Sequence, residues 1–202
     1  NSSIRKVTFA PNSKLHTIGS RAFYSARGLE SIVLPDTVRN INNKAFYYCN
    51  NLQFVDGTEN IENIGSSAFE RTEALENINI ESVKILSENS FYDSGLTSVV
   101  IPDGITIIPE NCFYDCPLTY IYIPDSVVTI KKQGFAHFNT VNFSTTLEGC
   151  QGVKNLEVSA FAKSGITSIS LPSIEYLEDG SSNPISGVFY YCEKLKTIEF
   201  GG

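Results

Sequence analysis

The stretch FYDCPLTYIYIPDSVVTIKKQGF, residues 113–135, contains the pattern that decides the fold of this chain. It begins and ends on a phenylalanine, and apolar residues lie five, eight and ten positions after the first one (Leu118, Ile121, Ile123). Residues two apart in a strand point to the same side, so the two isoleucines predict a short strand with one inward face. Pro124 comes next, and because proline lacks an N–H donor it ends the ladder of that strand.

The same frame recurs along the whole chain at intervals of 22 to 28 residues. Such an interval is too short for a domain and too long for one helix or strand. It is typical of one coil of a solenoid, which buries its apolar face only against neighbouring copies. The phenylalanines that close the coils, here called the anchors, are Phe23, Phe46, Phe69, Phe91, Phe113, Phe135, Phe161 and Phe189.

We therefore predict a repeat solenoid, wound as a right-handed superhelix, with the short strands forming one parallel sheet. The V-x-x-I step after the proline predicts an irregular, 3₁₀-like or short-strand return. The chain is expected to form a single domain over residues 1–202, with about eight coils and with both ends truncated. The anchors should stack into an interior column.

Four places depart from the regular frame. The coil with Leu75, Ile78 and Ile80 is one residue short and lacks the proline, and residues 53–57 lack the second strand isoleucine. Two late coils carry insertions, predicted as surface loops near 144–152, after a strand at 140–142, and near 178–188.

The charge of the chain excludes some partners. Its net charge is −7 with a pI near 4.9, and no cluster of Lys or Arg occurs. Nucleic-acid binding needs a concentrated positive field, so we predict no nucleic-acid partner. No run of 18 apolar residues is present, so we predict no membrane span in this segment.

The five cysteines follow the repeat rather than a metal-binding pattern. Cys49, Cys116 and Cys192 lie three residues after an anchor and Cys112 lies directly before one, where other coils have Ala, Ser or Thr. Such positions predict small buried slots. No C-x-x-C or His/Cys spacing occurs, so we predict no metal site and no cofactor. Cys150 lies outside the frame and is predicted to be the reactive thiol.

The sequence offers little catalytic chemistry. His16 and His137 belong to distant coils, and His137 is expected on an exposed turn. No serine or cysteine has a histidine and an acid in register, and no glycine-rich phosphate loop follows a strand. We predict that the chain is not an enzyme.

The repeated string AFxxCxxLxxIxIPxxVxxIxxxAF resembles the BspA-like leucine-rich repeats of cell-surface and secreted proteins in bacteria and some protists. The resemblance covers residues 4–200. It implies a leucine-rich-repeat solenoid that acts as an adhesion or recognition surface, located extracellularly or on a cell surface. The partners that it implies are host matrix proteins or neighbouring cells, and it implies no catalytic residue.

Outward strand positions are the predicted binding site for a protein or a glycan. Most are small and polar, but Val100, Tyr120 and Tyr122 fall in adjacent coils, with Phe54 and Val33 further towards the N-terminus. Exposed tyrosine beside β-branched residues is typical of binding patches. Cross-strand packing that stiffens the sheet is the alternative explanation.

Other functional hypotheses stay open at this point. The late-coil loops are further candidates for recognition, and the chain as a whole could instead be a structural spacer of an envelope protein. Tyrosines that follow the anchors indicate either scaffold or a carbohydrate-binding stripe. Apolar coil cross-sections at both ends predict possible end-to-end self-association.

Overall fold

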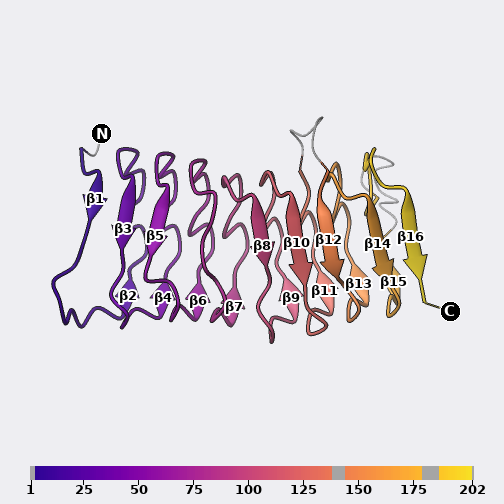
Figure 1. Cartoon of the computed structure of the whole chain (residues 1–202), viewed down its shortest axis with the longest axis horizontal. Coiled ribbons are helices and arrows are strands. Elements are labelled where there is room, and N and C mark those ends of the chain that lie inside the picture. The colour runs from indigo at the N-terminus through magenta and orange to yellow at the C-terminus, as the bar shows by residue number, and fades with distance from the viewer. Residues whose placement is uncertain (1–2, 138–143, 179–186, 202) are drawn as a thin grey trace.

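The computed structural model describes residues 3–137, 144–178 and 187–201. These residues form an elongated stack of coils, with the two ends of the chain at opposite ends of the stack (Figure 1). They contain sixteen short strands and no helix, and every strand pair is parallel. The predicted solenoid of short parallel strands is confirmed. No helix long and apolar enough to cross a membrane occurs in this part of the chain.

Most coils contribute two strands. One set, here called the principal strands, has two to four residues per strand and comprises β1 (Lys6–Val7), β3 (Ser31–Val33), β5 (Phe54–Asp56), β8 (Ser98–Val100), β10 (Tyr120–Ile123), β12 (Thr146–Gly149), β14 (Ser168–Leu171) and β16 (Thr197–Phe200). The return strands have two residues each and are β2 (Thr17–Ile18), β4 (Asn40–Ile41), β6 (Asn63–Ile64), β7 (Ile85–Leu86), β9 (Ile107–Ile108), β11 (Thr129–Ile130), β13 (Asn155–Leu156) and β15 (Tyr176–Leu177). The V-x-x-I return is thus a short strand in these coils.

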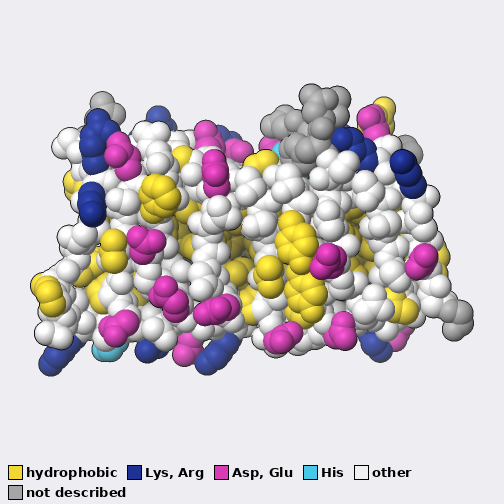
Figure 2. Space-filling model, viewed as in Figure 1, with side chains coloured by type: hydrophobic (Ala, Val, Ile, Leu, Met, Phe, Trp, Pro, Cys, Tyr) yellow, Lys and Arg dark blue, Asp and Glu magenta, His cyan; other side chains and the backbone are white. Residues whose placement is uncertain are grey.

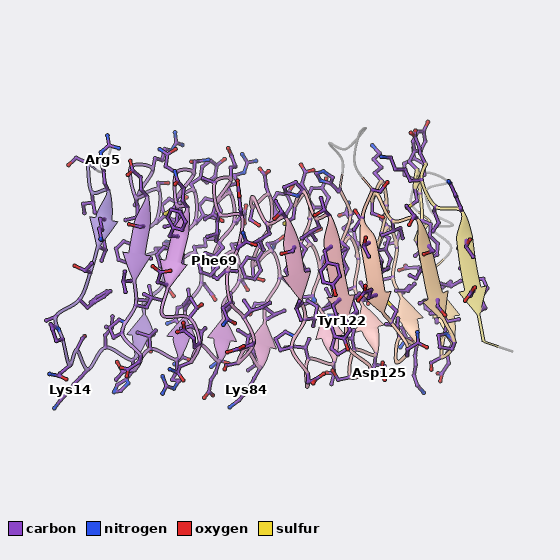
Figure 3. The ribbon with its side chains drawn as sticks, viewed as in Figure 1. Arg5, Lys14, Phe69, Lys84, Tyr122 and Asp125 are labelled. Atoms are coloured by element: carbon purple, nitrogen blue, oxygen red, sulfur yellow. The ribbon has the colours of Figure 1, made fainter. Side chains whose placement is uncertain are left out.

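The anchor phenylalanines stack into one column along an edge of the solenoid. All seven pairs of consecutive rings are stacked, with centroids 5.2–6.1 Å apart and interplanar angles of 2–12°. The rings from Phe46 to Phe161 are buried, and Phe69 lies inside the stack in Figure 3. The column is the continuous part of the core.

Six of the eight anchors lie between two residues with left-handed backbone, and Phe135 and Phe189 have one such neighbour each. Fourteen non-glycine residues, two positions before or after an anchor, have φ between 52° and 61°. Lys44 and Tyr48, which flank Phe46, are one such pair. A left-handed non-glycine residue costs about 1–2 kcal/mol, so packing of the anchors must outweigh a repeated local strain.

The principal sheet is not continuous, which corrects the prediction of one uninterrupted sheet. Its described strands pair as β1-β3-β5, β8-β10-β12 and β14-β16, and residues 77–79 form no strand. The return strands pair as β2-β4-β6-β7 and β9-β11-β13-β15, so β7 and β9 are also unpaired with each other. The principal sheet also has an interruption between β12 and β14, where a single bridge joins Thr145 and Ile166. Both sheets are interrupted at the short coil, while the anchor column passes through it unbroken.

The missing residue in this coil explains the interruption. In the regular coil the turn after the strand closes with Val127 N donating to Pro124 O at 3.1 Å. In the short coil Val83 N donates to Ile80 O at 2.9 Å, so Ile80 takes the place of the proline instead of that of the second strand residue. One residue fewer must then span the strand arc. Side chains in a strand alternate between the two faces with a period of two. With one residue missing, the segment cannot pair in register with both neighbouring strands and still direct the same side chains inward.

The insertion predicted near 144–152 is wrong in its placement. Strand β12 pairs with β10, with Ile121 opposite Leu147 and Ile123 opposite Gly149, so these residues belong to the regular coil. The strand expected at 140–142 falls outside the described residues, as does most of the segment 178–188. Gly149 has a φ of 87°, and a Cβ there would lie 1.8 Å from Ile123 O. Only glycine fits this close approach.

Because residues 146–149 are the strand of this coil, the prediction for Cys150 is also corrected. This residue follows Gly149 and takes the place of the turn proline, with Val153 N donating to its carbonyl at 3.2 Å. Its side chain is fully buried, and burial raises the pKa of the thiol to about 12. A buried protonated thiol is a poor nucleophile, so Cys150 is a core residue rather than a reactive one.

The other cysteines occupy the predicted small slots. Cys49, Cys112 and Cys116 are buried, Cys192 is half-buried, and none forms a disulfide. The thiols of Cys49 and Cys116 also donate to the carbonyl of the preceding coil's anchor, each at 3.0 Å. The slot therefore selects for a small side chain with a weak donor.

Candidate recognition surface

The predicted site residues lie on the side of the principal strands that faces away from the core, here called the principal face. Val100 lies directly opposite Tyr122 on the neighbouring strand, and Ser98 lies opposite Tyr120. Val100 is 56 % exposed, and both tyrosines are half-buried. The Tyr120 hydroxyl donates to Glu148 Oε2 at 3.0 Å, and this hydrogen bond raises the pKa of the phenol.

Val33 and Phe54 lie apart from that group. They occupy β3 and β5, one coil from each other, and are 40 % and 59 % exposed. The short coil separates them from Val100. The five predicted residues thus form two apolar patches rather than one, and yellow side chains gather in two separate areas of the principal face in Figure 2.

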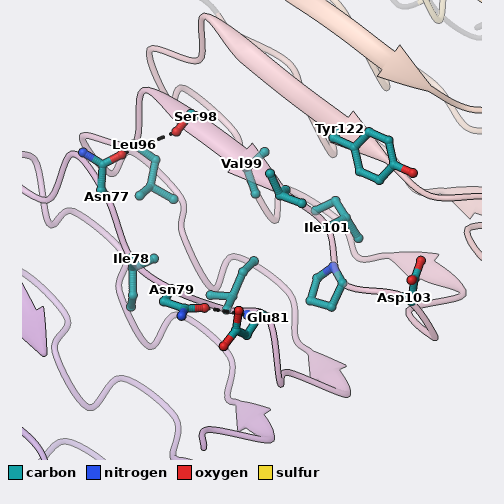
Figure 4. A pocket seen from close by; sticks show the side chains of 13 residues that line it. Asn77, Ile78, Asn79, Glu81, Leu96, Ser98, Val99, Ile101, Asp103 and Tyr122 are labelled. Atoms are coloured by element: carbon teal, nitrogen blue, oxygen red, sulfur yellow. Dashed lines mark hydrogen bonds between the residues drawn. The ribbon is translucent and has the colours of Figure 1, made fainter. Parts of the chain in front are cut away.

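A groove lies between the two patches because the sheet is interrupted there. Its larger part has a volume of about 580 Å³ and lies between residues 77–81 and 96–103, with Tyr122 beyond them (Figure 4). A second hollow of about 450 Å³ lies on the other side of residues 77–79, against residues 54–59. We call the larger hollow the face groove.

Two asparagines in the short coil form one wall of the face groove. Ser98 Oγ donates to Asn77 Oδ1 at 3.4 Å, and the backbone N–H of Glu81 donates to Asn79 Oδ1 at 2.9 Å. These side-chain hydrogen bonds stand where backbone strand pairing is lost, and both are drawn in Figure 4. They hold the interrupted segment in a defined conformation.

The principal face is acidic across six consecutive coils. The strand segments and following turns at 31–37, 54–59, 77–81, 98–103, 120–125 and 146–149 contain no Lys or Arg. Figure 3 places one of their acids, Asp125, close to Tyr122 near the ends of the principal strands. The acidic residues of these segments are Asp36, Asp56, Glu59, Glu81, Asp103, Asp125 and Glu148.

Sequence reasoning missed the residues that line the groove. Asn77, Asn79, Glu81 and Asp103 were not among the predicted site residues. The available signal was the missing residue and missing proline at 76–81, which was recognised as a departure but not as the origin of a groove. The sequence could not show that the neighbouring coils stay in place and leave the gap open.

The tyrosines after the anchors favour scaffold over a carbohydrate stripe. Tyr24 stacks on Tyr47 and Tyr92 stacks on Tyr114, with centroids 4.9 and 4.6 Å apart. Each ring therefore covers its neighbour's face along the stack instead of presenting that face to a sugar. Tyr48 lies between the guanidinium groups of two coils, Arg27 and Arg71, at 5.4 and 4.9 Å from the ring centroid.

The prediction for His137 is wrong, because this side chain is buried. Its Nδ1 lies 2.8 Å from Asp115 Oδ1, in the neighbouring coil. Each of these two residues lies two positions after its anchor, and residues at equal positions in adjacent coils stack on each other. Among the described residues no group of three or more His, Cys, Asp or Glu side chains is arranged to hold a metal ion.

The fold and the open face define the chain as a leucine-rich-repeat solenoid. The model of the BspA type leucine rich repeat region matches residues 1–94 and 106–202 in six copies, and the chain belongs to this family. No curated protein sequence matches it.

Three solved structures share the fold. A leucine-rich repeat protein from Bacteroides ovatus is 19 % identical, with a TM-score of 0.61 over 98 % of this chain and 64 % of that one. The leucine rich repeat protein of T. pallidum is 22 % identical, with a TM-score of 0.59 over 77 % and 70 %. A leucine rich cell surface protein from Faecalibacterium prausnitzii is 20 % identical, with a TM-score of 0.57 over 100 % and 74 %. This chain thus spans less than two thirds of the Bacteroides protein.

Proposed function

We propose that this chain is a non-catalytic recognition module of a secreted or cell-surface protein, and that it binds a protein or a glycan through its principal face. The observation that carries the proposal is the exposure of Phe54 and Val100 on either side of a groove in an otherwise small and polar sheet face. Exposed apolar side chains that gather beside a concave polar site favour a binding role.

The family supports the same function. The resemblance to BspA-like repeats implies host matrix proteins or neighbouring cells as partners, and one structural neighbour of this BspA type chain is a leucine rich cell surface protein. The loop predicted near 178–188 stays a candidate for recognition, although it lies mostly outside the described residues. End-to-end self-association also stays a prediction.

A structural spacer is the competing function, and the principal face argues against it. A spacer needs a face that is polar throughout, whereas this face exposes Val33, Phe54 and Val100. A recognition surface gives them a purpose.

A binding screen tests the proposal. Wild-type protein would be screened against extracellular matrix proteins and a glycan panel, together with the double variant Tyr120→Ala, Tyr122→Ala. We expect the double variant to fold normally and to lose about tenfold or more in affinity, because aromatic anchors dominate binding energy. The matched control is Tyr24→Ala with Tyr191→Ala, two exposed tyrosines on the anchor edge.

Two outcomes would contradict the proposal. One is the absence of any ligand in the screen, and the other is an equal loss of binding in the face variant and in the edge control. Binding that only the face variant loses supports it.

A further inference from the structure

Strand β8 has an open edge beside the face groove. In a parallel ladder, successive residues direct their N–H and C=O groups to opposite sides. Ile101 N donates to Tyr122 O at 3.0 Å, towards β10, so the N–H and C=O of Val100 point the other way, towards residues 77–79. No described strand pairs with β8 on that side, and the backbone contact with the short coil there comes before β8, where Thr97 N donates to Glu76 O at 3.1 Å. An unpaired strand edge is a template for another extended chain.

The face groove offers room and side-chain contacts along this edge. Its volume of about 580 Å³ is in the range of small ligand sites, which is about 300–1,000 Å³. The Val100 side chain is exposed at its margin, and Tyr122 lies on the far side of β8 (Figure 4). An extended segment beside β8 would direct alternate side chains outward, beside Val100, and inward, onto the groove floor that Leu96 and Val99 line.

Two carboxylates at one end of the groove indicate the charge of the occupant. Glu81 and Asp103 both line the groove, and neither forms an ion pair among the described residues. Lys84 and Arg39 line an adjoining hollow with them. Lys84 Nζ is already 3.0 Å from Glu62 Oε2, and the Arg39 guanidinium donates to the carbonyls of Asp36 and Val38. A cationic side chain would compensate this charge, whereas a neutral sugar would not.

We propose that the face groove binds an extended, cationic segment of a partner protein by strand addition to β8, with a Lys or Arg side chain between Glu81 and Asp103. This inference rests on the proposed function and names the partner class of the same surface. Backbone hydrogen bonds to Val100 supply the pairing, and the two carboxylates select the charge. Anionic segments are excluded by repulsion from the same two groups.

Hexapeptide libraries provide the test. Three libraries would share Val, Thr and Tyr at five positions and differ at one fixed position, which is Lys or Arg, Gln, or Glu. Retention on immobilised wild-type protein is read by mass spectrometry, and affinities of the best peptides are measured by fluorescence polarisation. We expect the cationic library to be enriched about tenfold or more over the Glu library, and its binding to weaken between about 0.05 and 0.5 M salt.

Matched variants separate charge from strand pairing. The double variant Glu81→Gln, Asp103→Asn should lose about tenfold in affinity for the cationic peptides. The control is Glu88→Gln with Glu193→Gln, which removes two charges away from the groove and should bind as wild type does. N-methylation of the peptide backbone should abolish binding, because it removes the donors that a strand needs.

Equal retention of the three libraries, no retention of any, or unchanged binding of N-methylated peptides would overturn this inference. The screen described under the proposed function distinguishes the two claims. Ligand capture that needs Tyr120 and Tyr122 but survives Glu81→Gln, Asp103→Asn would keep the recognition role and remove the cationic segment. Neutral glycans captured at the groove would do the same.

Discussion

The anchor edge and the principal face of this solenoid respond differently to the same loss of one residue. At the edge, Phe69 and Phe91 stack at 5.3 Å across the short coil, within the range of the other steps. On the face, the same coil pairs with neither β5 nor β8. The edge keeps its geometry because each coil contributes one ring and one tight turn of constant length, whereas a strand requires matched register over several residues.

This difference teaches that stacking and recognition are separable in this protein. The edge holds the coils together, so the face can lose pairing locally and still remain ordered. The cost is a few backbone hydrogen bonds, each of which contributes about 0.5–1.5 kcal/mol. The gain is a groove in a surface that regular repeats would make flat. The three predictions below test this division, from the largest effect to the smallest.

The largest effect is the difference in unfolding free energy expected between a phenylalanine-to-alanine substitution in the anchor column and one on the principal face. Phe91→Ala removes a fully buried ring from the column and should cost about 3–5 kcal/mol in the free energy of unfolding. Phe54→Ala removes an exposed ring from the face and should change it by less than about 0.5 kcal/mol. Chemical denaturation of both variants measures the difference. Equal losses would show that the column is not the main source of stability.

Repair of the short coil should close the groove. Asn79→Val with a proline inserted between Ile80 and Glu81 gives the sequence LENIVIPESV, which matches LTSVVIPDGI at residues 96–105. We expect a gain of about 1–2 kcal/mol from restored strand pairing and loss of any ligand that occupies the groove. Denaturation and hydrogen exchange at residues 77–79 measure it. The control is Asn79→Val without the insertion, which should leave the groove open.

The smallest effect is a pH-dependent change in stability at Asp93, which lies two positions after its anchor beside Asp115 and Arg71. Burial, followed by the neighbouring Asp115 carboxylate, raises the pKa of Asp93 above its ordinary 3.8, while Arg71, 3.7 Å away, opposes the shift. A raised folded-state pKa means that the stability contribution is complete below the unfolded pKa and is lost as pH rises through the folded one. The free energy of unfolding of Asp93→Asn, relative to that of wild type, should therefore rise as the pH goes from about 3.5 to about 7.

Thermal denaturation at the two pH values checks this sign. Asp36→Asn, which removes an exposed carboxyl from the principal face, is the control and should show no comparable trend. A stability difference for Asp93→Asn that falls as pH rises would mean that the ion pair with Arg71 outweighs burial and repulsion.

Sequence reasoning predicted the regular parts of the molecule well, because regularity is a local property. The anchors from Phe46 to Phe161, the strand residues Ile121 and Ile123, and the small slots at Cys49 and Cys116 are all buried as expected. The errors concern residues near irregular coils. Cys150 was predicted to be reactive because the frame after Phe135 was shifted, and the strand of that coil proved to be Thr146–Gly149. His137 was placed correctly in the frame, two positions after its anchor, but its side chain is buried against Asp115 instead of exposed.

The candidate site was predicted in part. Val100 and Tyr122 are neighbours as expected, since a constant period fixes which residues face each other across adjacent coils. The groove was not predicted, because its walls come from two coils whose separation depends on pairing that did not form. No single coil contains that information.

By itself, the sequence determined the repeat, its period, the inward face of each strand and the family of the protein. These follow from apolar residues at fixed spacing, which can be buried only when like coils stack. The tertiary structure alone decided where the ladders break, which carboxylates meet and where a groove opens. Those features depend on distances between coils, and such distances are set by competition between local register and the stacking of the whole column.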